Sequence, residues 1–577
     1  MLRTALAAAL CLLNLCAQAE EHPKLAPELK SLHDHSALDV IIQFRNLPTN
    51  DGRALQQRVA AHGGKLQHDF SFMHAMHATL PASKLAELES DGEVTYVSPN
   101  RKAAALLNNT AGAVNASYAT SLGLNGTGIA VGVIDSGIQR INDLNNTAGT
   151  ASRVLASYDI VGGGSDDAFG HGTHVSGIIA GNATQSTCST CTVQYRGLAP
   201  NANLINLRAL DKAGTGTDAT VIAAINQAIT SKTTYNIRVI NLSLGRPVYE
   251  SYTKDPLCQA VEAAWNAGIV VVVAAGNDGR DNSVNTSGYG TITTPGNDPF
   301  VITVGAMNAK GTPTRADDVM TSYSSKGPTA IDHIAKPDLV APGNQVTSLL
   351  ASGNQPLVTD FPSNRPLISV YESGNSDKKS EDYFILSGTS MAAPVVSAAA
   401  VLLIEQNPNL TPDQVKARLM KTAYKGLPSS VTIVSSGQTF VEQADVFTVG
   451  AGYVDIQAAL SDTSLAKLSA MSPVAVYNSS THAVSLQSNA SAVWGSNALW
   501  GSSAVWGANA FTSQSVPKGS NALWGSNALW GSNALWGSST DSGFNALWGS
   551  NALWGSSATD GDAATQSALA ILGGGDQ

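Results

Sequence analysis

The chain is poor in cysteine and in charged residues for its length of 577 residues. Only 13% of the residues are charged, and 43 acidic against 33 basic residues give a formal net charge of −10. Nucleic-acid binding depends on basic clusters that neutralise phosphates, and the sequence has no such cluster, so we expect no nucleic-acid partner. One Cys-x-x-Cys pair, Cys188 and Cys191, has no second pair to complete the four ligands of a zinc site.

Long apolar runs are also scarce. Residues 5–15 are apolar, follow Arg3 and precede Ala17-Gln18-Ala19, a pattern typical of a secretory signal peptide, residues 1–19. This run is about half of the roughly 20 residues that a membrane-spanning helix needs, and we expect no later segment to be long and apolar enough to span a bilayer. Cys16 leaves a lipoprotein signal open as an alternative, although the bulky Leu15 precedes it. The sequence therefore predicts a soluble protein that is secreted, with association to the cell surface left open.

Signal removal would leave three cysteines, Cys188, Cys191 and Cys258. In an oxidising compartment we expect one disulfide and one leftover thiol. The sequence does not decide which two cysteines pair.

The order of the expected elements divides the remaining chain into modules. Residues 37–101 predict a small βαββαβ unit, and small polar residues at 102–116 indicate a linker. In residues 117–460, short branched-apolar runs alternate with helical stretches, which predicts an α/β domain with a doubly wound, mainly parallel sheet. Residues 474–577 are a low-complexity tail in which the hexapeptide "NALWGS" recurs.

Ser390, in "LSGTSMAAP", is a candidate nucleophile. The stretch lacks the last glycine of the G-x-S-x-G turn of α/β-hydrolases, and the only histidine that follows, His482, lies beyond the helical part of the domain. Upstream, Asp135 ends a buried strand and His171 lies between two glycines at the start of a helix. The order Asp, His, Ser is that of subtilisin, whereas α/β-hydrolases have the order Ser, Asp or Glu, His, so the hypothesis of an α/β-hydrolase is rejected.

Each candidate lies where its chemistry needs it. Asp135 would end a strand at the edge where open α/β sheets gather functional groups. Ser390 would begin a helix, where free N–H groups and the helix dipole stabilise developing negative charge. Asn277 follows another buried strand and is a candidate donor to an oxyanion.

These stretches resemble the subtilisin-like serine peptidase family. "VIDSGI", "GHGTHVSG", "NLSLG", "AAGN", "KPDLVAPG" and "SGTSMAAP" occur in the family's order over roughly residues 117–460. The resemblance implies that Asp135 orients His171, that His171 acts as general base and then acid, that Ser390 attacks, and that Asn277 donates to the oxyanion. It also implies two stretches of backbone that pair with an extended substrate. A third stretch would form a wall of the pocket that holds the residue before the cleaved bond. The residues so assigned are Gly214, Thr215, Gly216, Ser243, Leu244, Gly245, Thr294, Pro295 and Gly296.

The resemblance further implies that residues 37–101 are a propeptide, a folding aid and temporary inhibitor that the enzyme itself removes. No cofactor is expected for the chemistry, whereas structural calcium stays open. Asp143 falls near a family calcium ligand, but its spacing from Asp135 is one residue short, and a cation such as calcium needs 6 to 8 oxygens. His174 is expected to pack in the core rather than to act in catalysis.

We therefore expect a secreted serine endopeptidase that cuts proteins or peptides through an acyl-enzyme and is made as a self-processed zymogen. A catalytically idle surface-binding protein on the same fold is one alternative, and the presence of all four candidate groups argues against it. An esterase is the other alternative. Two stretches of backbone that pair with an extended substrate favour peptides over small esters as substrates.

The tail contains eight of the nine tryptophans, on one six-residue register. In an extended chain an even spacing points them to the same side, whereas in a helix they would scatter. We expect the tail to attach the enzyme to a surface or polymeric substrate, or to support export.

Overall fold

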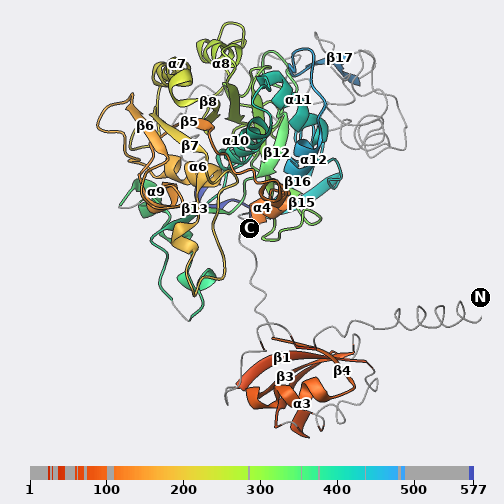
Figure 1. Cartoon of the computed structure of the whole chain (residues 1–577). Coiled ribbons are helices and arrows are strands. Elements are labelled where there is room, and N and C mark those ends of the chain that lie inside the picture. Colours follow the sequence, from red (N-terminus) through yellow and green to blue (C-terminus); the bar gives the residue numbers. More distant parts are fainter. Residues whose placement is uncertain are drawn as a thin grey trace, which may run out of the picture. The chain divides into compact units, whose positions relative to one another are not determined.

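The computed structural model describes residues 24–25, 29, 37–45, 57, 59–61, 63–70, 74–99, 109–283, 286–351, 354–374, 377–435, 437–478, 483–487 and 571–576. The chain divides into two compact units, Met1–Ala104 and Ala105–Gln577, which are described separately (Figure 1). The expected signal peptide and all eight tryptophans of the tail lie outside the described residues.

The N-terminal unit is a four-stranded antiparallel sheet in the order β2-β3-β1-β4. Its elements are β1 (Ala37–Phe44), β2 (Lys65–Phe70), β3 (Ala75–Pro81), η3 (Ala82–Lys84), α3 (Leu85–Ser90) and β4 (Val94–Pro99). Alternate residues of β1, namely Val40, Ile42 and Phe44, are buried, because successive side chains of a strand point to opposite faces. The described elements follow the predicted order, and the first predicted helix falls mostly outside the described residues.

The second unit is built on an eight-stranded sheet in the order β11-β10-β9-β8-β5-β7-β6, with β12 beside β10. Its strands are β5 (Ala130–Asp135), β6 (Val154–Asp159), β7 (Asn203–Arg208), β8 (Ile237–Leu242), β9 (Val270–Ala274), β10 (Ile302–Asn308), β11 (Val319–Met320) and β12 (Leu339–Pro342). All pairings are parallel except that of β10 with β11. The predicted α/β fold with a mainly parallel sheet is confirmed.

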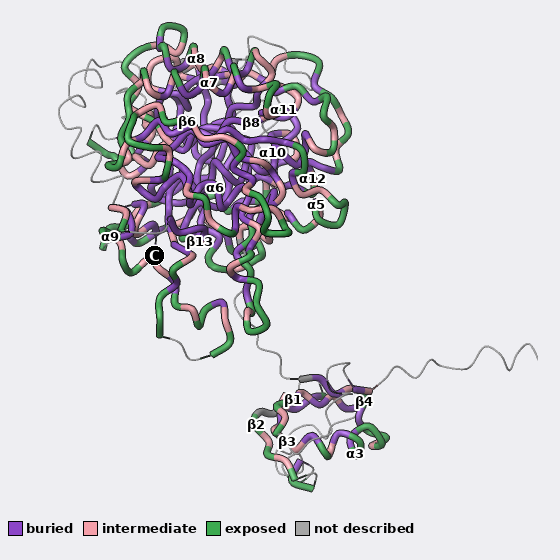
Figure 2. Tube along the Cα trace, turned by 60° about the vertical axis from the view of Figure 1, so that its left-hand side comes forward, coloured by how far each residue is buried: buried purple, intermediate pink, exposed green. Residues whose placement is uncertain are grey.

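Helices cover this sheet and bury it on both faces, as the continuous apolar strands require (Figures 1 and 2). Helices α7 and α8 pack on each other and on β5, β8 and β9, while α6 and α10 pack on each other and on the same part of the sheet. The helices are α4 (Asn109–Ala113), α5 (Ser117–Ser121), η4 (Asn142–Leu144), α6 (His171–Ala180), η5 (Thr184–Ser186), α7 (Asp218–Tyr235), α8 (Pro256–Asn266), α9 (Pro356–Asp360), η6 (Pro362–Asn364), η7 (Ile368–Val370), α10 (Thr389–Gln406), α11 (Pro412–Thr422) and α12 (Ile456–Ser461).

Helix α10 corrects the expectation that no segment after the signal is long and apolar enough to cross a membrane. Among the described residues it is the helix that meets that length and composition, with a mean hydropathy of 1.4. However, 89% of it is buried inside the fold, as expected for the central helix of a globular core. Its apolar character therefore reflects packing against the sheet.

Both predicted boundaries of the second unit need correction. The expected linker at 102–116 contains α4, and Ala113 and Val114 are fully buried, because small residues there allow close packing. The expected tail from residue 474 begins with a hairpin of β17 (Val474–Asn478) and β18 (Ala483–Gln487), whose Ala475 side chain is buried. Residues 571–576 also pack against this unit, so the tail is anchored at both ends.

Two further antiparallel strand pairs and one disulfide complete the second unit. β13 (Val346–Leu349) pairs with β14 (Tyr383–Leu386), and β15 (Ser430–Ser435) with β16 (Gln438–Gln443). The cysteine pairing left open by the sequence is Cys188 with Cys191, and Cys258 is a buried free thiol. Burial raises the pKa of the Cys258 thiol above its usual value, which keeps it protonated.

Candidate active site

The carboxylate and the imidazole of the predicted triad are in contact. Asp135 is the last residue of β5, and His171 is the first residue of α6. The Nδ1 atom of His171 lies 2.8 Å from Oδ1 and 3.0 Å from Oδ2 of Asp135. Both side chains are buried, with Asp135 1% and His171 4% exposed, so water competes little for this hydrogen bond. Nδ1–H donates to the carboxylate in this arrangement, and Nε2 is left as the basic nitrogen.

The turn before His171 depends on glycine. Gly170 has φ of 105°, and a Cβ on Gly172 would lie 2.2 Å from the carbonyl oxygen of Gly137 and 3.1 Å from Cβ of Asp135. A side chain at position 172 would therefore push α6 away from β5. Glycine at this position allows the helix to begin directly beside the strand that carries the carboxylate.

A second buried carboxylate, Asp167, holds this turn, and the sequence analysis missed it. Its Oδ1 accepts from the N–H of Gly170 at 2.7 Å and from Oγ of Ser136 at 2.8 Å, and its Oδ2 accepts from the N–H of Thr173 at 2.8 Å. It thus satisfies the first N–H groups of α6, as a capping side chain does. The signal was an aspartate just before the glycine-flanked turn in "DDAFGHG".

The environment of His171 raises the pKa of its imidazole above the usual 6.5. Burial alone would lower this pKa, because a buried charge is costly. The negative charge of Asp135, its hydrogen bond and the charge of Asp167 outweigh burial and stabilise the imidazolium. An imidazole prepared in this way accepts a proton more readily.

Ser390 lies in the first turn of α10, next to the ends of neighbouring strands. It follows Gly388 and Thr389, and it is 8% exposed. Its Oγ donates to the carbonyl oxygen of Ser243, just after β8, at 3.2 Å, and Oγ of Ser243 donates to the carbonyl oxygen of Ser390 at 2.8 Å. The described contacts include no hydrogen bond between Ser390 and His171. Such bonds are often long without substrate and tighten in the complex.

Asn277 lies beside Gly388 and Thr389, the two residues before Ser390, in a fixed orientation. Its Oδ1 accepts from the N–H of Thr389 at 2.9 Å and from Oγ1 of Thr389 at 3.1 Å. The amide Nδ2 faces Gly388, since a Cβ added there would lie 3.3 Å from this nitrogen. Because Thr389 binds the oxygen end, the N–H end of the amide is available next to Ser390, as an oxyanion donor requires.

The predicted substrate-binding residues lie in three segments, of which the first, residues 214–216, is the most exposed. Gly214, Thr215 and Gly216 follow β7, and the Asp211 carboxylate holds this loop by accepting from the N–H of Thr215 at 3.1 Å. Gly214 has φ of 73°, and a Cβ there would lie 2.7 Å from the ring of Phe169. The loop therefore lies against the segment that leads to His171.

Ser243, Leu244 and Gly245 follow β8 and lead into an antiparallel bridge between Arg246 and Thr294. A Cβ on Gly245 would lie 2.4 Å from Oγ1 of Thr293. These contacts bring the second predicted edge next to the predicted pocket wall.

Thr294, Pro295 and Gly296 are buried, and the Gly296 carbonyl accepts from Oγ1 of Thr303 at 2.7 Å. The wall segment is thus a rigid part of the core, held to β10.

The surroundings of Asp143 do not fit a calcium ion. Its Oδ1 accepts from the N–H of Gln185 at 2.7 Å, and its Oδ2 from the hydroxyl of Tyr383 at 2.8 Å. Arg153 donates to its carbonyl oxygen at 3.0 Å. Burial, the largest influence, raises the pKa of Asp143. Hydrogen-bond donors and a guanidinium take the places that a cation would need, so the calcium expectation at Asp143 is not carried forward.

His174 is a core residue, as expected. It is fully buried, and its Nε2 lies 3.2 Å from the carbonyl oxygen of Val346 and 3.1 Å from that of Phe384. Burial lowers its pKa to about 3, so the imidazole stays neutral. It links α6 to β13 and β14.

Asp135 ends β5, whereas Ser243 and Asn277 follow β8 and β9. These three strands are neighbours in a parallel sheet, so their carboxyl ends meet at one edge. A buried carboxylate–imidazole pair, a serine at a helix N-terminus and an oriented amide form the set of groups that serine-dependent acyl transfer requires.

Comparison with known proteins agrees with this class. Residues 126–452 match the subtilase family, so the chain belongs to that family. It is 34% identical over 429 residues to the serine protease AprX of Bacillus subtilis strain 168, which covers 72% of this chain and 89% of the relative. It is 32% identical over 368 residues to subtilisin E of the same strain, with 63% of this chain and 79% of the relative covered.

A thermostable alkaline protease of Halalkalibacterium halodurans is 30% identical over 367 residues, which cover 63% of this chain and 81% of the relative. Family and relatives together identify the chain as a serine endopeptidase, which acts on proteins or peptides. The resemblance drawn from the sequence motifs is confirmed.

Proposed function

We propose that the chain is a secreted, self-processed serine endopeptidase in which Asp135, His171, Ser390 and Asn277 perform the chemistry. The observation that supports this most strongly is the buried contact of 2.8 Å between Nδ1 of His171 and Oδ1 of Asp135. It prepares a base at the edge of the sheet where Ser390 and Asn277 also lie.

In the proposed mechanism the Ser390 hydroxyl leaves the carbonyl of Ser243 and gives its proton to Nε2 of His171. Its Oγ attacks the substrate carbonyl carbon, and the resulting oxyanion accepts from Nδ2 of Asn277. His171 then passes the proton to the leaving amine, the C–N bond breaks, and an acyl-enzyme remains on Ser390. A water molecule releases the acyl group by the same steps, and Asp135 stabilises the imidazolium each time.

An extended substrate would bind between residues 214–216 and 243–245, with its backbone paired to both edges. Residues 294–296 would wall the pocket for the residue before the cut. The exposure of the first loop and the fixed position of the second support this assignment. Two backbone edges recognise an extended peptide, which favours peptide cleavage over the hydrolysis of small esters.

The N-terminal unit would be the propeptide, with residues 37–101 as inhibitor and folding aid. Its own hydrophobic core, with Val40, Ile42 and Leu80 buried, supports a unit that stays folded after it is cut off. The signal-like residues 1–19 support secretion. The repeat tail would attach the secreted enzyme to a surface or to a polymeric substrate.

The variant Ser390→Ala tests catalysis and self-processing together. We expect it to lose peptide hydrolysis and to remain at the size of the form with residues 37–101 attached, because one serine performs both cuts. The exposed Ser363→Ala is the matched control and should mature normally. Maturation of Ser390→Ala in a protease-free preparation would show that another enzyme removes the N-terminal unit.

A further inference from the structure

The last residues of the chain occupy a specific position on the catalytic unit, although the sequence predicts only a low-complexity tail there. Ile571 and Leu572 are 4% and 9% exposed and belong to the main hydrophobic core. Asp576 is 1% exposed. The segment 571–576 is therefore a packed part of this unit.

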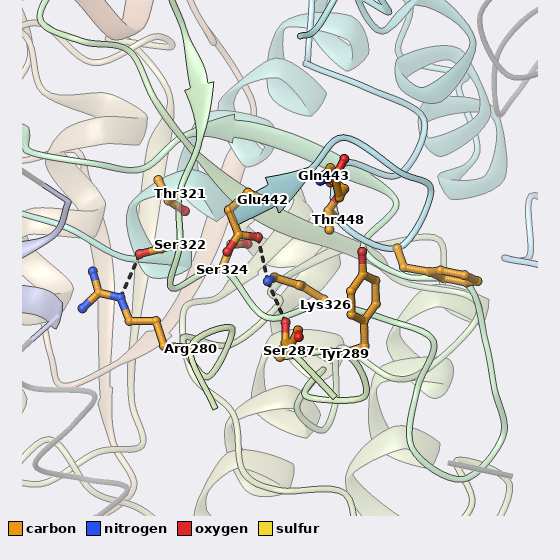
Figure 3. Close-up of polar contacts among 12 residues, drawn as sticks. Arg280, Ser287, Tyr289, Thr321, Ser322, Ser324, Lys326, Glu442, Gln443 and Thr448 are labelled. Atoms are coloured by element: carbon orange, nitrogen blue, oxygen red, sulfur yellow. Dashed lines mark hydrogen bonds and ion pairs between the residues drawn. The ribbon is translucent and has the colours of Figure 1, made fainter. Parts of the chain in front are cut away.

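The carboxylate of Asp576 has a dedicated set of donors. Its Oδ1 accepts from Arg280 at 2.7 Å and from Oγ of Ser322 at 2.6 Å, and its Oδ2 accepts from the N–H of Ser322 at 2.7 Å. Arg280 also donates to Oγ of Ser322 at 2.8 Å, and Figure 3 shows these two side chains pointing toward each other. Charge-assisted hydrogen bonds of this kind are strong when they are shielded from water.

Arg280 is the cation that pairs with Asp576, because the nearby lysine already pairs with another carboxylate. Lys326, the nearby lysine in Figure 3, is paired with the buried Glu442 at 2.6 Å and donates to the carbonyl oxygen of Ser287 at 2.9 Å. Among the ion pairs of the described residues, Arg280 pairs with Asp576. The carboxylate thus completes a partly buried basic site.

The backbone of the segment is also recognised. Asn344 donates from Nδ2 to the Asp576 carbonyl and accepts at Oδ1 from the Asp576 N–H, both at 2.8 Å. Asn364 donates to the carbonyl oxygen of Gly573 at 2.7 Å. A Cβ on Gly573 would lie 2.1 Å from the ring of Phe361. These contacts select the glycine-rich sequence before the aspartate.

The segment reaches the turn that carries the nucleophile. The N–H of Ser387 donates to the carbonyl oxygen of Leu572 at 3.0 Å. A Cβ added to Gly388 would lie 3.5 Å from Cδ2 of Leu572 and 3.3 Å from Nδ2 of Asn277. Leu572 and the candidate oxyanion donor therefore flank the same residue, two positions before Ser390.

We propose that the catalytic unit carries a receptor site for its own C-terminal segment, in which Arg280, Ser322 and Asn344 recognise Asp576 and Leu572 is held beside Gly388. Docking attaches both ends of residues 488–570 to the catalytic unit, so a cut within them leaves the C-terminal fragment bound. Docking also restricts substrate residues that would extend past Gly388, and this second consequence rests on the proposed function.

Binding is tested first, in a Ser390→Ala background that prevents self-cleavage. The probe is a fluorescent synthetic peptide with the sequence of residues 568–577, and the receptor is the chain ending at Ala570. We expect saturable binding by fluorescence anisotropy, and binding at least about tenfold weaker for the same peptide carrying Asp576→Ala. A peptide with Gln577→Ala is the matched control and should bind like the parent.

A full-length receptor guards against a truncated chain that fails to fold. The full chain with Asp576→Ala should bind the parent peptide, the unaltered full chain should not, and Arg280→Gln should abolish binding in the truncated chain. Equal binding of the parent and Asp576→Ala peptides, or no binding to either receptor, would overturn the site.

Restricted access is tested separately with active enzyme. Ending the chain at Ala570 should lower KM for peptides with several residues after the cleaved bond and leave the cleavage of short anilides unchanged. Adding the peptide of residues 568–577 should raise that KM again. Unchanged KM for long substrates, with short anilides still cut, would overturn restricted access and leave the proposed catalytic function intact.

Discussion

At the scale of single residues, the site is organised by hydrogen bonds that fix orientation. Thr389 holds the oxygen of Asn277, Asp135 holds Nδ1 of His171, and Asp167 holds the turn that begins α6. The first contact leaves Nδ2 of Asn277, and the second leaves Nε2 of His171, as the atoms proposed to act on the substrate. Preorganised groups of this kind stabilise charge without having to reorient during the reaction.

The first prediction at this scale concerns Asn277. We expect Asn277→Ala to lower kcat by about 10²–10³ with little change in KM, the loss known for the equivalent donor of subtilisin, because the amide stabilises charge that exists only in the transition state. Steady-state kinetics on a peptide substrate measure it. Thr389→Val keeps the backbone N–H and should lose much less. A raised KM at unchanged kcat would assign Asn277 to substrate binding instead.

The second prediction concerns pH. Neutral His171 must accept the proton of Ser390, and Asp135 raises the pKa of this imidazole above 6.5 despite burial. The kcat/KM of the enzyme should therefore rise with pH and reach half its maximum above pH 6.5. Asp135→Asn should move the midpoint to lower pH and reduce kcat by about 10⁴-fold. A midpoint below 6.5 in the parent enzyme would contradict this account of the imidazole.

At the scale of elements, the sequence predicted well wherever pattern and chemistry coincide. Continuous apolar runs indicated the parallel strands. The sequence also contains a capping-box pair, Thr411 and Gln414, at the observed start of α11, where the N–H of Gln414 donates to Oγ1 of Thr411 at 3.3 Å. The residues proposed for catalysis could be chosen because their types and order are specific.

Packing of small residues could not be predicted in the same way. The stretch around Ala113 resembles a linker but is core, and Asp167 gave only a weak capping signal. The glycines before Asp576 look flexible, yet Gly575 adopts φ of 62° and fits between Ser387 and Asn344. Such positions are decided by distant partners that no local pattern reveals.

The prediction at this scale compares two truncations, after Leu460 and after Gln487. The shorter chain loses the β17–β18 hairpin and Ser472, whose Oγ donates to Oδ1 of the buried Asp338 at 2.5 Å and accepts from Nζ of Lys416 at 3.0 Å. Loss of a buried partner costs about 1–3 kcal/mol, so its Tm should be lower. Both chains lack residues 571–576, so the comparison isolates residues 461–487, which contain the hairpin and the segment before it.

The chain ending at Gln487 should also cut short peptides and bind insoluble protein or cells less than the full chain does. Thermal unfolding, peptide cleavage and sedimentation with insoluble protein measure these results. Equal Tm values would show that the fold ends near residue 460. If the chain ending at Gln487 fails to cut a short peptide, the repeats belong to the catalytic fold.

At the scale of the whole molecule, the chain joins an independently packed N-terminal unit, a subtilase unit and a repeat region whose far end returns to that unit. In the proposed scheme the two terminal parts act on the same enzyme in different ways. The N-terminal unit would block substrate binding until it is removed, whereas the C-terminal segment would remain bound next to Gly388.

The prediction at this scale is that residues 37–101, added as a separate polypeptide, inhibit the mature enzyme. The unit has its own core, so it can fold and bind without being linked to the enzyme. Inhibition constants from peptide hydrolysis measure the effect, and Ile42→Asp, which places a charge in that core, is the control that should not inhibit. A folded unit that leaves activity unchanged at micromolar concentration would contradict the propeptide role.

The central claim is that Ser390, activated by His171, is the nucleophile, and covalent labelling tests it most directly. A fluorophosphonate reacts with an activated serine hydroxyl, and mass spectrometry of the digested protein locates the adduct. We predict one adduct on Ser390 in the mature enzyme, none on that peptide in Ser390→Ala, and strongly slowed labelling in His171→Ala. An adduct on another serine, or labelling of Ser390 at the same rate without His171, would contradict the claim.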